Sequence, residues 1–179
     1  GGIVATMLAG ALLPALESIF HMTTDISWLE QADLNHPLMR RLSIEAPGTY
    51  HHSLVLANLS EAAAESIGAN ASMCRVCSYF HDIGKLSKPE YFIENMSPDE
   101  NPHDDLTARM SALVLIAHVK DGVDLALKHR LNSRIIDVIE QHHGNSLVYF
   151  FYRRALDQKK EIIRLVEQDK AREDDVPEV

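Results

Sequence analysis

The chain has 179 residues, of which 46% are hydrophobic and 24% are charged, and its formal net charge is -9. A chain of this length and apolar content buries one sizeable core and suits one domain. The acidic balance excludes broad electrostatic capture of duplex nucleic acid, which needs a surplus of Lys and Arg. Its two cysteines are too few and too close in sequence for a disulfide framework, which indicates a reducing compartment.

The first predicted element lies in residues 1–20, where Glu17 is the single acidic or basic residue. The uncharged run 1–16 falls just short of the ~20 apolar residues that span a bilayer. We interpret residues 1–20 as the end of a truncated transmembrane helix or as a juxtamembrane segment. A signal-peptide core and a buried N-terminal helix are the alternatives, but no basic segment precedes the run and Pro14 would disturb a core helix.

Residues 21–168 have a helical pattern punctuated by Gly and Pro, without an alternating run long enough for a sheet. The sequence therefore predicts one all-α domain over 21–168, followed by an acidic solvated tail at 169–179. Start and stop signals predict helices at about Thr49–Ile67, from Asn70 or Ser72 to Ile83, and at Thr107–Lys120, Val123–Arg130, Ser133–His143 and Ser146–Gln168.

Five histidines and one aspartate lie on the apolar stripes or at the ends of these predicted helices: His52, His81, Asp82, His118, His142 and His143. Residues three or four apart share a helix face, so we expect His52 to point inward with Val55 and Leu59. The same spacing predicts inward positions for His118, His142 and His143. His81 and Asp82 would then project into the pocket between the helices.

A single buried histidine is more often a hydrogen-bonded core residue than a metal ligand. Five imidazoles and a carboxylate together would leave many buried donors and acceptors to satisfy without a cation. There are more of them than one zinc ion takes, which suggests two ions. Imidazole and carboxylate ligands suit iron, manganese or zinc. Two such ions would bridge a hydroxide and clamp a phosphate, so the pattern favours phosphoester hydrolysis.

Several strings of residues match those of a known family: Ala46–Ser53, Tyr79–Lys85, Asn101–Asp104, His118–Gly122 and Gln141–Gly144. Together they resemble the HD superfamily of metal-dependent phosphohydrolases. The likeness is greatest to the cytoplasmic domain of the seven-transmembrane HD family of bacterial cyclic di-AMP phosphodiesterases.

This resemblance implies an all-α HD domain that hydrolyses cyclic di-AMP to pApA by attack of a metal-activated hydroxide on phosphorus. It implies two divalent ions, iron or manganese with zinc as the alternative, and these metal ligands: His52, His81, Asp82, His118, His142 and His143. It also implies a position on the cytoplasmic face of the bacterial membrane, after the last membrane helix. The family pattern continues to a later helix with a further aspartate ligand, a role that we assign to neither Asp174 nor Asp175.

Catalytic roles are expected for His81, Asp82 and Lys85, and substrate contacts for Lys85, His103, Lys120 and Tyr152. Lys85 would contact a phosphate, although a lysine beyond a helix end also complements the helix dipole. His103 would belong to a lid, Lys120 would orient a ligand, and Tyr152 would stack on adenine. The alternative for His103 is a solvent-facing position in the loop, and the alternative for Tyr152 is aromatic packing in the core.

Three other functions remain open from the sequence. The substrate could be cyclic di-GMP, although the Gly-Tyr-Pro signature of that HD branch is absent, or a guanosine alarmone. A third alternative is a non-catalytic sensor that binds nucleotide or metal. Cys74 and Cys77 have the spacing of a redox or zinc motif, but they lack a second pair, so packing within a helix is favoured.

Overall fold

The computed structural model describes residues 25–168 and 170–172, together with residues 2, 6, 7, 10–12 and 19. All regular elements in this part of the chain are helices, which confirms the all-α prediction. Most of the segments 1–20 and 169–179 lie outside the described residues. Among the helices that are described, none has the length and apolar character needed to cross a membrane.

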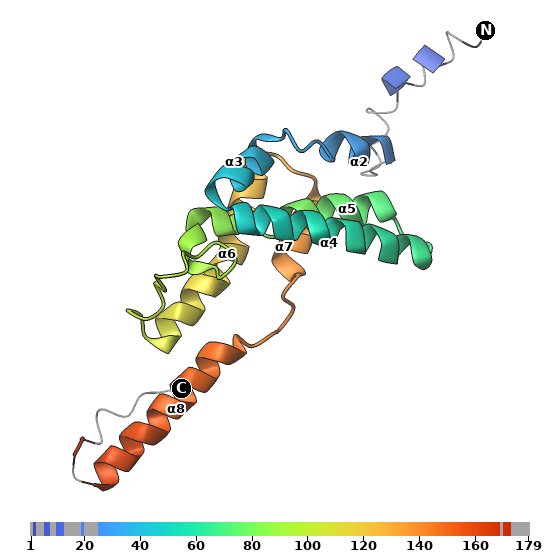
Figure 1. Ribbon diagram of the computed structural model, residues 1–179. Coiled ribbons are helices and arrows are strands. Elements are labelled where there is room, and N and C mark those ends of the chain that lie inside the picture. Colours follow the sequence, from blue (N-terminus) through green and yellow to red (C-terminus); the bar gives the residue numbers. More distant parts are fainter. Residues whose placement is uncertain are drawn as a thin grey trace.

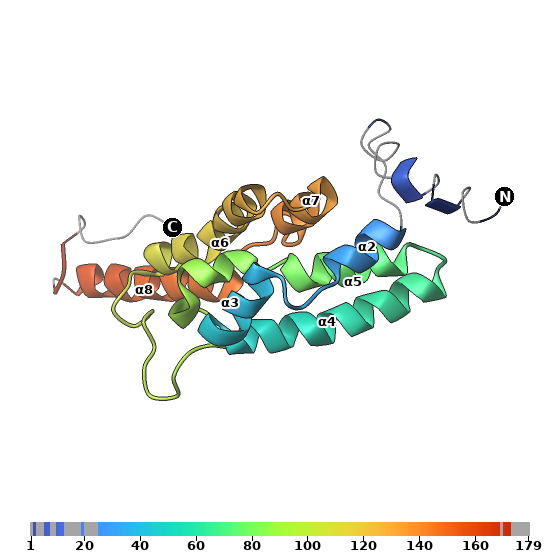
Figure 2. The same ribbon diagram turned by 90° about the horizontal axis from the view of Figure 1, so that it is seen from above.

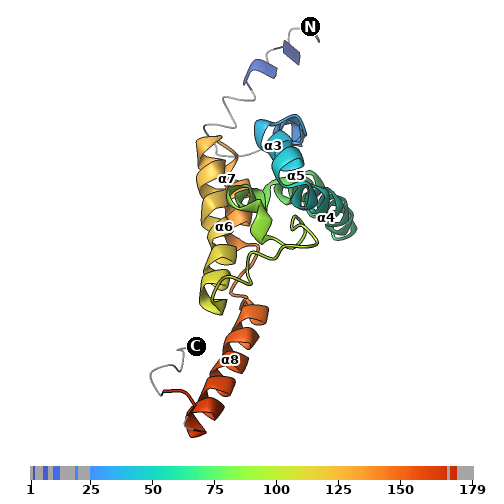
Figure 3. The same ribbon diagram turned by 60° about the vertical axis from the view of Figure 1, so that its left-hand side comes forward.

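The elements follow one another in this order: α2 (Asp25–Gln31), α3 (Pro37–Glu45), α4 (Pro47–Ser66), α5 (Ala71–Phe80), the short 3-10 helices η1 (Ile83–Ser87) and η2 (Pro89–Tyr91), α6 (Ala108–Lys128), α7 (Ser133–Gln141) and α8 (Tyr149–Glu167). Helices α4 and α5 lie side by side (Figures 1 and 2), and α6 pairs with α7. Helix α8 projects away from the body, beyond the N-terminal end of α6 (Figures 1 and 3).

The core lies where α2, α3, α5, η1 and α7 meet. Its largest fully buried side chains include those of Trp28, Leu38, Phe80, Ile83 and Ile139. Removing such side chains from water is the main stabilising contribution, about 1.5–3 kcal/mol for each. The core therefore fixes the end of α5 against the end of α7, where the histidines are concentrated.

Helix α4 turns small residues inward, contrary to the sequence expectation. Its buried residues are Thr49, Ser53, Ala57 and Ala64. Val55 and Leu59 are 45% and 64% exposed, and His52 is also exposed. The prediction that His52, Val55 and Leu59 point inward was therefore wrong. The small side chains let α4 approach α5 closely, and the larger apolar residues of α4 then face outward.

Helix α6 is one continuous helix, whereas the sequence analysis predicted a break before Gly122. Gly122 is buried inside α6 and contacts Gly84 of η1. A Cβ on Gly84 would lie 1.8 Å from the His118 carbonyl oxygen and 2.5 Å from the Gly122 nitrogen. A mid-helix glycine costs about 1 kcal/mol, but here it allows direct backbone contact between η1 and α6.

Candidate metal centre

The His-Asp pair lies where α5 changes into η1. Helix α5 ends at Phe80, so the buried His81 and Asp82 project from the bend between the two helices. Asp82 Oδ2 lies 3.1 Å from His81 Nε2 and 2.9 Å from Lys85 Nζ. The carboxylate is 4% exposed and is therefore almost entirely removed from water.

Three more imidazoles reach this carboxylate from α6 and from the end of α7. His118 Nε2 and His142 Nε2 each lie 3.5 Å from Asp82 Oδ1. His118 Nε2 is also 3.2 Å from His143 Nε2 and 3.4 Å from His142 Nε2. One nitrogen or oxygen from each of Asp82, His118, His142 and His143 lies within 4.8 Å of all the others.

Backbone contacts orient three of these rings. The Nδ1 atoms of His81 and His142 lie 2.8 Å and 2.9 Å from the carbonyl oxygens three residues earlier, and His118 Nδ1 contacts the Leu115 carbonyl in the same way. Because a carbonyl only accepts, each Nδ1 carries the proton. A neutral ring with its proton on Nδ1 presents its unprotonated Nε2 to the cluster, which is the form that binds a metal.

This arrangement leaves polar atoms that the described side chains do not satisfy. Asp82 Oδ1 is buried without a hydrogen-bond partner. The facing Nε2 lone pairs of His118 and its neighbours would repel unless a proton or a cation lay between them. An unsatisfied buried carboxylate oxygen among imidazole lone pairs is the donor set that a divalent cation satisfies.

The electrostatics of the cluster favour an ionised Asp82. Burial by itself would raise the pKa of this carboxyl, but the imidazoles of His142 and His81 and the charge of Lys85 outweigh burial and hold it well below its usual range. Burial, followed by the neighbouring His142 and His118, lowers the pKa of His143 to about 4. A negative carboxylate and a neutral imidazole are the forms in which both groups bind metals.

A second group of donors shares the same carboxylate. His52, His81 and Asp82 also offer one atom each within 4.8 Å of the others, and the His52 and His81 rings are 5.5 Å apart between centroids. His52 is exposed, as is His143, so both lie at the solvent side of the cluster rather than in its interior. The structure thus brings the six side chains together, with Asp82 common to two groups.

The four expected substrate contacts occupy different positions. Lys85 lies at the centre, and its side chain is 13% exposed. His103 is buried, with its ring centroid 4.9 Å from that of Phe151 and its Nε2 2.9 Å from the Tyr91 carbonyl oxygen. Lys120 is exposed on α6, about 200° around the helix from His118. Substrate contacts by these residues stay predictions.

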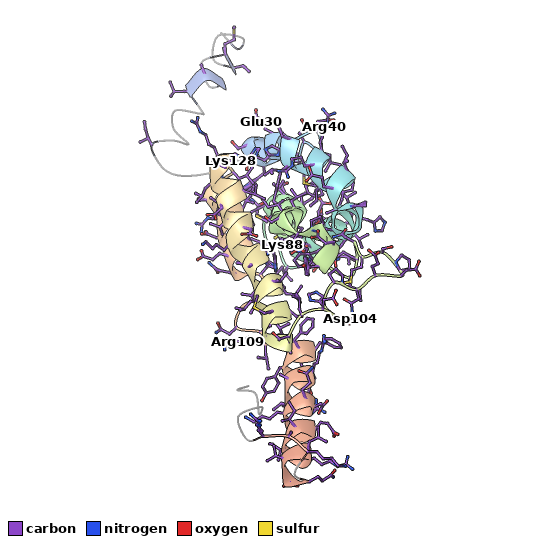
Figure 4. The ribbon with its side chains drawn as sticks, turned by 90° about the vertical axis from the view of Figure 1, so that its left-hand side faces the viewer. Glu30, Arg40, Lys88, Asp104, Arg109 and Lys128 are labelled. Carbon is purple, nitrogen blue, oxygen red and sulfur yellow. The ribbon has the colours of Figure 1, made fainter. Side chains whose placement is uncertain are left out.

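Tyr152 lines a pocket of about 420 Å³ between the first turns of α6 and α8. Its lining is mainly apolar and includes Ala112, Ile116, Val148 and Phe151. The α6 residues that line the pocket all precede His118 in the sequence. Another lining residue, Ser146, follows His143 by three positions. Figure 4 shows Arg109, another lining residue, and Asp104 on opposite sides of the ribbon at the level where α6 meets α8.

Three residues beside Lys85 were missed by the sequence analysis: Thr49, Glu94 and Asn95. Glu94 Oε1 lies 2.7 Å from Lys85 Nζ, and the Thr49 hydroxyl donates to the same oxygen. Asn95 Oδ1 accepts from the Thr49 N–H at 3.1 Å and thereby caps α4. One sequence feature pointed to such a partner. Ala46, at the N-cap of α4, has no side-chain acceptor for the free N–H groups of the first turn, so another residue must supply one.

Comparison with known proteins identifies the class to which this site belongs. Residues 49–174 match the HD domain, so the chain belongs to the HD domain family. It is 42% identical over 161 residues to the cyclic-di-AMP phosphodiesterase PgpH of Bacillus subtilis (strain 168), an alignment that covers 90% of this chain and 23% of that protein.

A Listeria protein and a Listeria crystal structure are similarly related. The chain is 43% identical over 155 residues to the cyclic-di-AMP phosphodiesterase PgpH of Listeria monocytogenes serotype 1/2a (strain 10403S), with 87% of this chain and 22% of that protein covered. The crystal structure of the L. monocytogenes phosphodiesterase PgpH HD domain in complex with cyclic-di-AMP matches with a TM-score of 0.68 at 44% identity, over 70% of this chain and 59% of that one. The chain thus spans less than a quarter of the two full-length relatives.

Proposed function

We propose that this chain is a metal-dependent phosphodiesterase domain that hydrolyses cyclic di-AMP to pApA. The observation that carries the proposal is the buried Asp82 Oδ1, which lacks a hydrogen-bond partner while two imidazole Nε2 atoms face it at 3.5 Å. The names of the PgpH relatives and the cyclic-di-AMP in the related Listeria structure support the substrate.

Two divalent ions, iron or manganese, would be held by the six side chains of the cluster: His52, His81, Asp82, His118, His142 and His143. Asp82 belongs to both donor groups and would bridge the ions. When bound, such ions supply Lewis acidity and lower the pKa of coordinated water. His81 and Asp82 keep the donor atoms in place because both are buried at the end of α5 and because His81 Nδ1 contacts the Ser78 carbonyl.

Lys85 supplies a fixed positive charge beside this centre. Its Nζ lies 2.9 Å from Asp82 Oδ2, and burial of its stem leaves the ammonium facing the cluster. An ammonium in this position would neutralise a non-bridging oxygen of the scissile phosphate as negative charge accumulates there. Charge-assisted hydrogen bonds of this kind are worth about 1.5–3 kcal/mol.

The apolar pocket beside Tyr152 would receive an adenine base. Its lining combines flat apolar surface with the Tyr152 ring, which is what a nucleobase needs for stacking. Arg109, at the same pocket, carries a charge opposite to that of the dinucleotide phosphates. His103, whose carbonyl accepts from Arg154 at 3.0 Å, would hold the preceding loop against α8.

We further propose that residues 21–168 form the HD domain and that the domain works at the cytoplasmic face of a bacterial membrane. The apolar segment 1–20, which carries one charged residue, would be the connection to that membrane. The acidic net charge is compatible with a small dinucleotide held by metal, rather than with a long nucleic acid.

The test is turnover of cyclic di-AMP beside cyclic di-GMP by the chain loaded with Mn²⁺ or Fe²⁺, with pApA measured by chromatography. Asp82→Asn, which keeps the shape of the side chain and removes its charge, should lower bound metal at least tenfold and abolish turnover. Asp99→Asn, on the exposed loop, is the control and should behave as the wild type. Metal-loaded protein that hydrolyses cyclic di-GMP instead, or neither nucleotide, would contradict the proposal.

A further inference from the structure

The sharp turn Phe92–Asn95, between η2 and α6, contacts several parts of the metal centre. The Asn95 N–H closes the turn on the Phe92 carbonyl at 2.8 Å. The buried Phe92 ring lies edge-on to the His118 ring, with centroids 5.5 Å apart, and Lys85 Nζ is 4.9 Å from the Phe92 ring centroid. A single turn therefore contacts both a proposed metal ligand and the proposed phosphate-binding lysine.

Within this turn, Glu94 contacts the charged end of Lys85. Glu94 Oε1 lies 2.7 Å from Lys85 Nζ, and Asp82 Oδ2 lies 2.9 Å from the same nitrogen. A free lysine side chain has about 2 kcal/mol of rotamer entropy and samples many positions. Two carboxylates at separate fixed points hold the ammonium in one position, which a single carboxylate cannot do.

Glu94 is itself held by the first turn of α4. The fully buried Thr49 donates its hydroxyl hydrogen to Glu94 Oε1 at 2.9 Å and accepts from Asn95 Nδ2 at 2.8 Å. A Cβ on Gly48 would lie 1.9 Å from the Glu94 carbonyl oxygen, so α4 and the turn are in direct backbone contact. The backbone and the side chain of Glu94 are thus fixed by separate contacts.

We propose that Glu94 is a positioning residue that sets where Lys85 meets the substrate phosphate. Glu94 keeps the ammonium between the turn and Asp82, so that the charge faces the scissile phosphodiester instead of pairing with Asp82 alone. The part that concerns phosphate rests on the proposed function. The part that concerns the position of Lys85 depends only on the contacts between Lys85, Glu94 and Thr49.

The first experiment is a double-mutant cycle on cyclic di-AMP hydrolysis by the Mn²⁺-loaded chain. Glu94→Gln should lower kcat/KM about tenfold without changing metal content, and Lys85→Met should lower it by at least as much. The double variant should match Lys85→Met within about twofold, because Glu94 acts through Lys85. Losses that multiply in the double variant would overturn the proposal, and the exposed Glu100→Gln is the control that should equal the wild type.

The second experiment needs no turnover. Acetylation by N-hydroxysuccinimidyl acetate, measured by mass spectrometry, should rise several-fold at Lys85 in Glu94→Gln and stay unchanged at the exposed Lys88 and Lys120. If Lys85 acetylation were equal in the wild type and in Glu94→Gln, the positioning role would be refuted whatever the substrate. Absence of wild-type turnover with the expected acetylation would instead refute only the proposed substrate.

Discussion

Gly84 is the point at which η1 rests on α6, and Gly84→Ala tests whether this contact sets the geometry of the metal ligands. The new Cβ would lie 1.8 Å from the His118 carbonyl oxygen, so the two backbones must separate by about 1.6 Å to reach an ordinary contact of 3.4 Å. Asp82, two residues from Gly84, now has Oδ1 3.5 Å from His118 Nε2. Metal-ligand distances tolerate only about 0.2 Å, so we expect shared coordination by Asp82 and His118 to be lost.

The cost in stability should be large because the clashing atoms belong to the backbone. Overpacking of this kind costs about 3 kcal/mol or more, which corresponds to a fall in Tm of about 6–12 °C in a chain of this size. We would measure bound Mn²⁺ by mass spectrometry after dialysis and Tm by circular dichroism.

Gly122→Ala is the graded comparison for Gly84→Ala. Its Cβ would meet the Cγ2 atom of the buried Ile139 at 2.8 Å and the Gly84 nitrogen at 3.3 Å, so a smaller displacement relieves the clash, and alanine offsets part of the cost with about 1 kcal/mol of helix propensity. We expect Gly122→Ala to lose less metal and to lower Tm less than Gly84→Ala. Wild-type metal content in Gly84→Ala, with Tm within about 2 °C of the wild type, would refute the reasoning.

Three further predictions concern other parts of the structure. Thr49→Val should lower the free energy of unfolding by about 2–4 kcal/mol, because Glu94 and Asn95 lose a hydroxyl partner. Thr49→Ser keeps the hydroxyl and should lower the free energy of unfolding by about 1 kcal/mol. Equal losses for the two variants in urea denaturation would contradict this prediction. Burial raises the pKa of Cys77 to about 12, so iodoacetamide at about pH 8 should alkylate Cys74 and spare Cys77 in the folded protein, a difference that peptide mass spectrometry measures. Burial by itself would raise the pKa of Glu94, but the hydrogen bond and charge of Lys85 lower it below its ordinary value of 4.5. The stability that ionised Glu94 adds is therefore complete above about pH 4.5 and is lost as the pH falls further, so the difference in unfolding free energy between wild type and Glu94→Gln should shrink on acidification; a constant difference would contradict the pKa direction.

Helix positions were predictable where the signals are local. Asn70 and Asn132 cap α5 and α7 through their side chains, and Gly68 ends α4 with a positive φ of 69°. The error at Gly122 has the opposite origin. A glycine that ends a helix and a glycine that admits another backbone look alike in sequence, and only the position of Gly84 distinguishes them.

Which face of a helix is buried was less predictable than where the helix begins and ends. The pattern around His52 favoured an inward Val55 and Leu59, but α4 buries Ser53 and Ala57 instead. Hydrophobicity alone ranks the larger residues as core, whereas the close packing of α4 on α5 selects the smaller ones. His52 still reaches the cluster, from its solvent side.

The sequence by itself determined the all-α class and the six side chains that gather at the centre, because helical periodicity, caps and the chemistry of imidazole and carboxylate are properties of short segments. Only the tertiary structure decided that Lys85 lies between Asp82 and Glu94 and that Thr49 holds Glu94 from 45 residues away in sequence. Contacts of that kind depend on where α4, η1 and the turn Phe92–Asn95 pack in space, and no local pattern specifies that packing.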